Sequence, residues 1–521
     1  MRRGPGLLFL ASGLGALLLL AGLYLRQAPL RAGLDLDAQH HIAAVRELAK
    51  GEFPPRHNLV AGHLPQGHYG PYLVCLGWLA RKSGAPPLTV LYAAGILNLA
   101  LFVLLVRRAA ERLSGEGAGR WAVLATLLLW GPWPRPVPTW PARGWPGSTS
   151  LAEAQNFFYP QQAGLVLLLL ALLLLLPRDA APRPRASMSR WLAALLVSAA
   201  LVASHPLSGL ALVPLLAALV LAESLRRESS GARLGLLLGL PAAALLLASL
   251  WPCYPVLGLL QAAAAPGVAL DPGPEPLAGA PAAAAPPGAG AALHWPSLPL
   301  GEVLGPSLVG LVGFVWLLRR GRPFLALWFA ANLALAALPW LPLRHRFVFF
   351  AALPLQLAAC GVLERGWRSG RPGRIAALLL LGAGAVSVGQ RLHWLLEREV
   401  PELGFVSRFT PQDAVVLSDQ TTSNGVAGLA GRKVVAPQNP DLFLVASGGW
   451  QRVLDARRFF SRQASQEERA AILRRWGVTH VLLDRLRPAS PETLPYPLLH
   501  EQGGYRLYSS GSSTRPGPAS E

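Results

Sequence analysis

The chain has 521 residues, of which 52% are hydrophobic and only 14% are charged, whereas a soluble globular protein carries about 25% charged residues. This composition excludes a water-soluble body of that size, so most of the chain is expected to have the lipid bilayer as its solvent. The net charge of +20 does not indicate nucleic-acid binding, because the arginines stand in short clusters between apolar runs rather than on one basic face.

The apolar runs predict an α-helical polytopic membrane protein, since they approach the length of about 20 residues that a bilayer requires. The arginine clusters between them would all face the cytoplasm, as the positive-inside rule demands. We expect about eleven transmembrane helices, which puts the N-terminus in the cytoplasm and the C-terminus outside the inner (plasma) membrane. These helices are placed at 7–25, 88–106, 121–133, 161–177, 191–204, 207–222, 234–250, 303–318, 323–339, 347–363 and 374–390.

Two stretches fit this series less simply. The apolar run 69–80 is too short to cross alone, and we expect a re-entrant or interfacial helix on the outer side. The runs 191–204 and 207–222 are joined only by His205 and Pro206, which leaves a tight hairpin that does not fully cross as an alternative.

The last quarter of the chain has the composition of a soluble protein. Strand-like runs at 414–418, 433–436 and 478–483 accompany a helix that a capping box from Ser465 to Glu468 would start and Gly477 would end. We therefore expect a small extracytoplasmic α/β domain at 391–508. It follows a transmembrane domain at 1–390 and precedes a disordered Ser-, Pro- and Gly-rich tail at 509–521.

The first outer loop contains the first candidate site, at Asp35, Asp37 and His41. Asp37 and His41 would lie one helical turn apart on one face, where a carboxylate beside an imidazole suits a general base or a metal site. The alternative is that Asp37 is only the N-cap of a surface helix, a position that favours aspartate.

A second candidate is the run Arg344, His345 and Arg346 at the outer end of a span, where topology does not require positive charge. Arginine can bind a lipid-linked phosphate through two parallel hydrogen bonds. The alternative is that these side chains extend to lipid phosphates without any substrate.

Further polar residues near the outer ends of spans could contact a substrate. His205 stands at a helix break, where a satisfied structural histidine is the usual finding. Polar residues before a span are likewise common in loops. The candidate contacts are His41, His205, Glu153, Tyr159 and Gln161.

In these features the chain resembles the polytopic clan C (GT-C type) glycosyltransferases, which use polyprenyl-phosphate sugars as donors. The resemblance rests on an acidic first outer loop, an outer C-terminal domain and short motifs. The motifs are Asp35 and Asp37, the stretch from His41 through Gly51 to Pro54, Tyr69 to Tyr72, and Tyr159 to Gln161.

The resemblance implies transfer of a sugar with inversion to a glycan or lipid acceptor of the envelope, at the outer face of the membrane. Asp37 or Asp35 would be the general base, and Arg344 and Arg346, with His345 between them, would hold the donor phosphate. The family has adjacent acidic residues where this chain has Asp-Leu-Asp, which leaves both the base and a divalent metal cofactor open. The alternatives are a transporter or flippase for a lipid-linked glycan and a non-catalytic scaffold.

Overall fold

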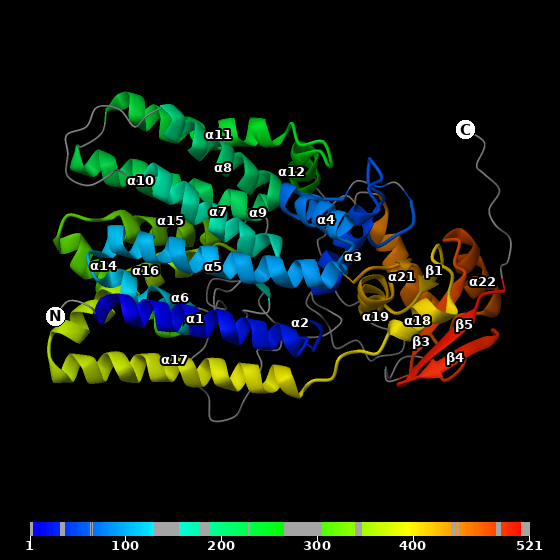
Figure 1. Cartoon of the computed structure of the whole chain (residues 1–521). Coiled ribbons are helices and arrows are strands. Elements are labelled where there is room, and N and C mark those ends of the chain that lie inside the picture. Colours follow the sequence, from blue (N-terminus) through cyan, green and yellow to red (C-terminus); the bar gives the residue numbers. More distant parts are fainter. Residues whose placement is uncertain are drawn as a thin grey trace. The chain divides into compact units, whose positions relative to one another are not determined.

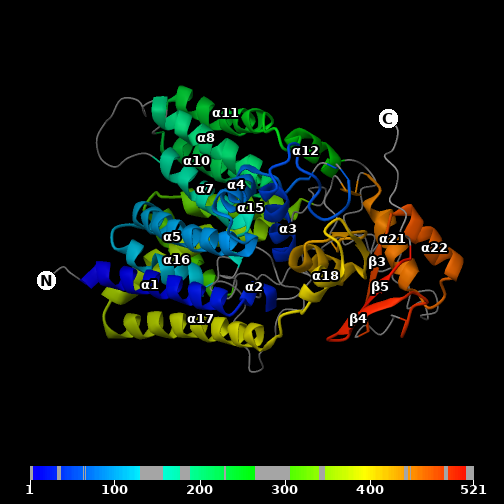
Figure 2. The ribbon, with the colours of Figure 1, turned by 45° about the vertical axis from the view of Figure 1, so that its right-hand side comes forward.

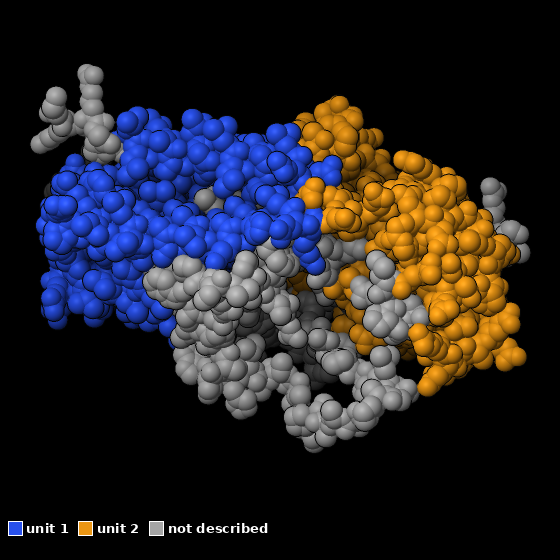
Figure 3. Space-filling view, turned by 90° about the horizontal axis from the view of Figure 1, so that it is seen from below, with its two compact units in different colours: residues 1–28, 92–250, 276–398 blue, residues 29–91, 251–275, 399–521 orange. Residues whose placement is uncertain are grey.

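A computed structural model of the chain (Figure 1) describes residues 4–31, 37–62, 64, 66–129, 156–176, 188–227, 230–264, 305–338, 346–438, 444–445, 447–485 and 491–511. The chain forms two compact units, which are coloured separately in Figure 3. Unit 1 comprises residues 1–28, 92–250 and 276–398, and unit 2 comprises residues 29–91, 251–275 and 399–521.

Unit 1 consists of apolar helices, the conformation in which a lipid-exposed backbone satisfies its own polar groups. The long helices α1, α5 and α17 run with their axes nearly parallel (Figure 1, Figure 2). The elements are α1 (Gly4–Leu25), α5 (Pro87–Ser114, which begins in unit 2), η1 (Ala118–Trp121), α6 (Ala122–Leu128), α7 (Pro160–Leu175), α8 (Met188–Ser204), α9 (Pro206–Leu210), α10 (Leu212–Arg226), α11 (Gly231–Ala248), η4 (Gly305–Val309), α14 (Gly310–Arg319), α15 (Phe324–Ala337), α16 (Arg346–Arg368) and α17 (Arg371–Glu397).

Each of the expected spans coincides at least in part with one of these helices. Among the described residues, 6 helical segments are long and apolar enough to cross a membrane, and shorter apolar helices of 10–17 residues accompany them. This agrees with a polytopic membrane protein, whereas the number of eleven spans stays a prediction. The long segments are Gly6–Leu25, Pro87–Ser114, Ser208–Arg226, Gly231–Ala248, Phe347–Arg368 and Arg371–Glu397.

Glycines bring α14 and α16 into close contact. A Cβ atom on Gly310 would lie 2.2 Å from the carbonyl oxygen of Leu355, and one on Gly313 would lie 2.7 Å from that of Ala358. Gly310 and Gly313 are three residues apart, so they share one face of α14. Small residues on one face allow helix backbones to approach in this way, which is the usual means of packing helices within a bilayer.

Unit 2 contains a five-stranded sheet in the order β2-β1-β3-β5-β4. Strand β1 pairs in parallel with β2 and β3, whereas β5 pairs antiparallel with β3 and β4. The strands are β1 (Val415–Leu417), β2 (Lys433–Val434), β3 (His480–Asp484), β4 (Leu498–Gln502) and β5 (Tyr505–Ser509).

The inner strands of the sheet are buried on both faces, and neighbouring residues of each strand point to opposite sides. On one face Val416 and Leu482 pack with Ala43 from the first part of the chain. On the other face Leu417 and Val481 pack with α21 (Gly449–Phe460) and α22 (Gln466–Arg475). Part of one layer of the α/β sandwich is therefore supplied by residues that lie, in sequence, between the first and second segments of unit 1.

The remaining elements of unit 2 come from both ends of the chain. Helix α4 corresponds to the expected short helix at 69–80; it packs on α3, and a Cβ atom on Gly77 would lie 2.3 Å from Cβ of Leu48. These elements are α2 (Ala28–Arg31, which begins in unit 1), α3 (Ala38–Ala49), α4 (Pro71–Ser83), α12 (Val256–Ala264), α18 (Gly404–Phe409), α19 (Gln420–Gly425) and the π-helical turn η5 (Val426–Ala430).

The three expected strands correspond to β1, β2 and β3, and the capping box of Ser465 and Glu468 is present at the start of α22. Helix α21 and the β4–β5 hairpin were not predicted. Ser509, the first residue of the expected tail, belongs to β5, and residues 512–521 lie outside the described residues. The boundary between 390 and 391 stays a prediction; the compact units divide the chain differently, since unit 2 also takes in residues 29–91.

The close contact of α14 and α16 leads to a test. Gly310→Ala should lower the free energy of unfolding by about 1–3 kcal/mol, because the added methyl group overpacks the contact with Leu355. The thermal midpoint of the detergent-purified chain measures this change. Gly235→Ala on α11 is the matched control, because nothing lies within 4 Å of its added Cβ atom. Equal midpoints for the two variants would contradict this account of the packing.

Candidate functional site

Asp37 stands at the start of α3. Its backbone carbonyl accepts a hydrogen bond from the His41 amide at 3.1 Å, the first bond of the helix. Its half-buried side chain occupies the N-cap position but makes no capping hydrogen bond to the first turn. The carboxylate is therefore not engaged in the role that the capping alternative assigns to it. Asp35 lies outside the described residues.

Three histidine rings gather on and beside α3. The ring of His68 lies 5.6 Å, between centroids, from the rings of both His40 and His41. His40 and His41 are buried, and His68 is half-buried. Of these three histidines only His41 was predicted as a site residue, although His40 is adjacent to it and His68 directly precedes the Tyr69 motif. The structure thus brings imidazoles from two parts of unit 2 together near the start of α3.

The loop that carries His68 is held to α3 by side chains. The Nδ1 atom of His57 accepts hydrogen bonds from the amides of Leu59 and Val60, both at 3.2 Å. The amide of Gln66 donates to Asn58, and Asn58 in turn donates to the carbonyl of His40 at 3.1 Å.

A buried carboxylate anchors the other end of α3. Glu47 accepts hydrogen bonds from the amines of Lys433 at 2.9 Å and Lys50 at 2.8 Å, and its side chain is only 4% exposed. Lys433 also donates to the carbonyl of His57. Because Lys433 lies on β2, this network ties α3 and the following loop to the edge of the sheet.

Backbone contacts reinforce the same attachment. Arg46 donates to the carbonyls of Ala427 and Gly428 in η5, both at 2.8 Å. Gly428 has to be small, because a Cβ atom there would lie 2.4 Å from the side-chain oxygen of Gln39. The amide of Val434 donates to the carbonyl of Leu59 at 2.8 Å, which adds one parallel bridge to the outer edge of β2.

The charges in this network shift one another's protonation. Burial alone would raise the pKa of Glu47, but hydrogen bonds and positive charge from Lys433 and Lys50 outweigh it, so the pKa is lowered. Burial lowers the pKa of the Lys433 amine, and Glu47 opposes this only in part. Burial and then the nearby charge of Arg432 lower the pKa of Arg46. The carboxylate is thus held in its charged form.

Tyr159 and Gln161 lie in unit 1, at the start of α7, and both are buried. Their position is set by the preceding Phe158, whose ring lies 6.2 Å from each of the stacked rings of Tyr24 and Tyr92. These rings join the beginning of α7 to α1 and α5. Both residues therefore stand on a rigid part of the helical unit.

His205 also lies in unit 1, at the predicted break between α8 and α9. Its Nδ1 atom accepts a hydrogen bond from the Ser208 amide at 3.1 Å and so caps α9. Ser208 packs against α7, where a Cβ atom on Gly164 would lie 2.9 Å from that of Ser208. The structure thus brings the turn of His205 close to the first turns of α7, which contain Gln161.

The structure describes no side chain for the remaining predicted site residues. Glu153, Arg344 and His345 lie outside the described residues, and Arg346 is placed only as the first residue of α16. Among the residues that the structure describes, no group of three or more His, Cys, Asp and Glu side chains is arranged to hold a metal ion.

No known protein-family profile matches the chain, and no curated protein is significantly similar to it in sequence. Solved structures of the Archaeoglobus fulgidus oligosaccharyltransferase are distantly similar. Its apo form is 14% identical, with a TM-score of 0.48, over 91% of this chain and 69% of that chain. The form tethered with an acceptor peptide is 12% identical, with a TM-score of 0.45, over 91% and 69% of the two chains. The complex with Zn and sulfate is 13% identical, with a TM-score of 0.46, over 89% and 68%.

Removal of the charge on Glu47 should loosen α3. Glu47→Gln is expected to lower the free energy of unfolding by about 3 kcal/mol, because it leaves the ammonium group of Lys433 buried without its counter-charge. The thermal midpoint of the full chain in detergent would fall by several degrees. Glu52→Gln is the control, since Glu52 and Arg56 form a half-exposed pair that should contribute less than about 1 kcal/mol. A control that lost as much would contradict the anchoring role.

Acid should reduce the difference in thermal midpoint between wild type and Glu47→Gln. The pKa of Glu47 is lowered from its ordinary value of 4.5, so its contribution is present above that value and is lost as the pH falls through the lowered pKa. The midpoint difference between wild type and Glu47→Gln should be constant near neutral pH and shrink below about pH 4.5. A difference that persisted unchanged in acid would show that the charge of Glu47 does not stabilise the fold.

Proposed function

We propose that the protein is a membrane glycosyltransferase that transfers a sugar from a polyprenyl-phosphate donor to a glycan or lipid acceptor of the cell envelope. The reaction takes place at the outer face of the inner membrane, and unit 2 lies on that side. The observation that carries the proposal is the carboxylate of Asp37, which stands at the start of α3 beside the histidine cluster and does not cap its helix. The family resemblance of the first outer loop supports the same reading.

In this reaction Asp37 takes the proton from an acceptor hydroxyl. The hydroxyl oxygen forms a bond to the anomeric carbon while the bond from that carbon to the phosphate oxygen breaks, and polyprenyl phosphate leaves with the electron pair. Attack from the face opposite the leaving group inverts the anomeric centre. Arg344 and Arg346, with His345, hold the leaving phosphate and stabilise its developing charge. Asp35 is the alternative base.

The anchoring of α3 supports this role for Asp37. A general base has to be within hydrogen-bond reach of the proton it removes, so its helix has to be fixed. Arg46 and Glu47 hold the far end of α3 to η5 and β2, and Asn58 holds the loop to its near end. Both ends of the helix are thereby constrained, although only one of them carries the proposed base.

Exchange of the proposed base tests the function in cells. A strain lacking the protein should lose one sugar from an envelope glycan, and wild type should restore it. Asp37→Asn should reduce transfer by about 10²–10⁴-fold, the usual contribution of a general base, and so fail to restore it. Mass spectrometry of the envelope glycans measures the sugar. Asp413→Asn, an exposed carboxylate in the same unit, should restore it fully.

Other outcomes would redirect or remove the proposal. Restoration by Asp37→Asn but not by Asp35→Asn would make Asp35 the base. Restoration by the Asp35 and Asp37 double variant would contradict base catalysis by this loop. Proteoliposomes with donor and acceptor on the same side of the membrane separate the enzyme from the transporter or flippase, because only a transferase forms product there.

A further inference from the structure

The ends of several helices in unit 1 surround a cavity. It lies between the C-terminal ends of α5, α7 and α10 and the beginning of α15. Its volume is about 150 Å³, well above the roughly 10–15 Å³ that one water molecule requires. The cavity is separate from every residue that the proposed function uses, so it calls for an explanation of its own.

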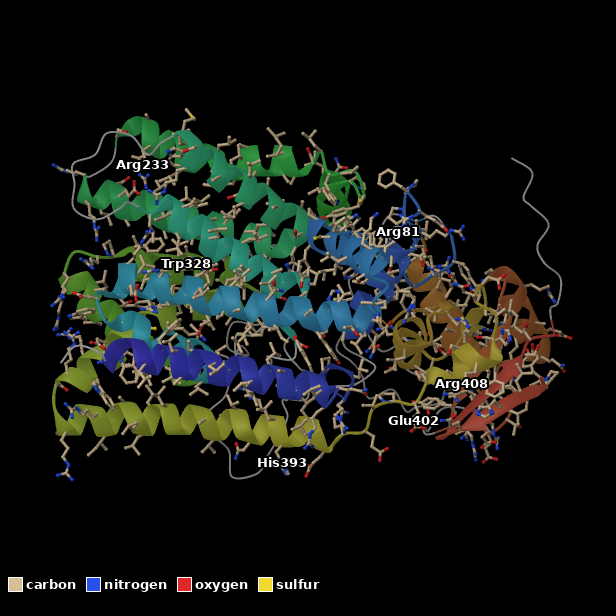
Figure 4. The ribbon with its side chains drawn as sticks, in the orientation of Figure 1. Arg81, Arg233, Trp328, His393, Glu402 and Arg408 are labelled. Atoms are coloured by element: carbon tan, nitrogen blue, oxygen red, sulfur yellow. The ribbon has the colours of Figure 1, made fainter. Side chains whose placement is uncertain are left out.

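The lining of this cavity is positively charged. Arg112, Arg226 and Arg322 reach it from three different helix ends. The carboxylate in the lining is Glu223, and Arg233 already neutralises it through hydrogen bonds of 2.7 and 2.6 Å. Arg233 extends from the start of α11 toward α10 (Figure 4). Three arginines and one carboxylate thus line the cavity.

Two of these arginines are held in place by the backbone. Arg112 donates to the carbonyl of Leu173 at 3.0 Å, and Arg226 donates to that of Gly321 at 2.8 Å. A guanidinium group has five N–H donors, and these bonds to carbonyl groups help to orient it. Other arginines at this end of unit 1 have a different environment: Arg320 and Arg365 both lie over the ring of Trp316, 4.4 Å from its centroid.

The remaining walls of the cavity are apolar, and so is the surface beside it. Leu176, Leu219 and Phe324 form part of the lining. Leu225, directly before Arg226, is 69% exposed, as expected of a side chain that faces lipid tails. Cationic groups around a cavity, next to an exposed apolar surface, suit a ligand that combines a phosphate with hydrocarbon chains.

We propose that this cavity binds the phosphate headgroup of an anionic membrane lipid. The guanidinium groups of Arg226 and Arg322 hold the phosphate oxygens, and the acyl chains lie along the exposed leucines of α10. Because the expected topology puts these helix ends at the cytoplasmic face, the lipid belongs to the inner leaflet. The binding is independent of sugar transfer and of Asp37.

The test compares two double variants in nanodiscs. Native mass spectrometry of wild type should show phosphatidylglycerol retained in preference to phosphatidylcholine. Arg226→Gln with Arg322→Gln should reduce this retention about tenfold or more, because charge-assisted hydrogen bonds to phosphate are lost. Arg227→Gln with Arg319→Gln removes the same charge from neighbouring residues outside the lining and should leave retention unchanged.

Three outcomes would overturn the proposal. Equal loss in both double variants would mean that general surface charge attracts the lipid. Undiminished retention in the Arg226 and Arg322 variant would exclude these residues. Stabilisation of wild type by inorganic phosphate as large as that by phosphatidylglycerol would assign the cavity to free phosphate. If the double variant does not fold, Arg322→Gln alone is measured, with Arg319→Gln as its control.

Discussion

The buried pair of Glu47 and Lys433 joins two parts of the chain that are 386 residues apart in sequence. A charged pair of this kind is weak as a source of stability when compared with apolar packing, but the loss of one partner is costly. It therefore acts chiefly as a constraint on position. The contact of Glu47 with Lys433 fixes α3 against β2, and Arg46 adds a second attachment through the carbonyls of η5.

The geometry of the candidate site follows from that constraint. Helix α3 is only 12 residues long, and an isolated helix of this length is marginal in water. Its order comes from the sheet on which Ala43 packs, from α4 and from the loop that carries His57. Asp37, His40 and His41 stand at the start of a helix whose direction is set by the last quarter of the chain. A role for that domain in catalysis thus needs no residue of its own at the reacting atoms.

Local patterns in the sequence predicted much of the fold. Features that depend only on neighbouring residues could be predicted directly from the sequence. These are the apolar runs, the strands near 415, 433 and 480, and the capping box of α22. The β4–β5 hairpin also had a local signal, since Gly503 and Gly504 both have positive φ and form the two-residue turn that such hairpins favour.

The contacts between distant parts of the chain could not be predicted from neighbouring residues. The docking of α3 on the sheet depends on partners hundreds of residues away, and no periodicity reports them. His57 and His68 lie in an irregular loop, where spacing carries little information about which rings meet. Asp37 could be singled out, but whether its side chain capped the helix depended on the geometry of one turn. The role proposed for Arg344 and His345 still rests on sequence alone.

The origin of one sandwich layer in residues 38–60 has a consequence for biosynthesis. At roughly 5–20 residues per second, translation reaches Lys433 about 20–80 s after it has passed Glu47. During that interval the helices from α5 to α17 are synthesised, while α3 has no sheet to pack on. The apolar face of α3 and the carboxylate of Glu47 have no partners in the sheet during this time. Residues 38–60 must therefore stay unaggregated until the strands of the sheet have been synthesised, and this order makes the completion of unit 2 a late step of assembly.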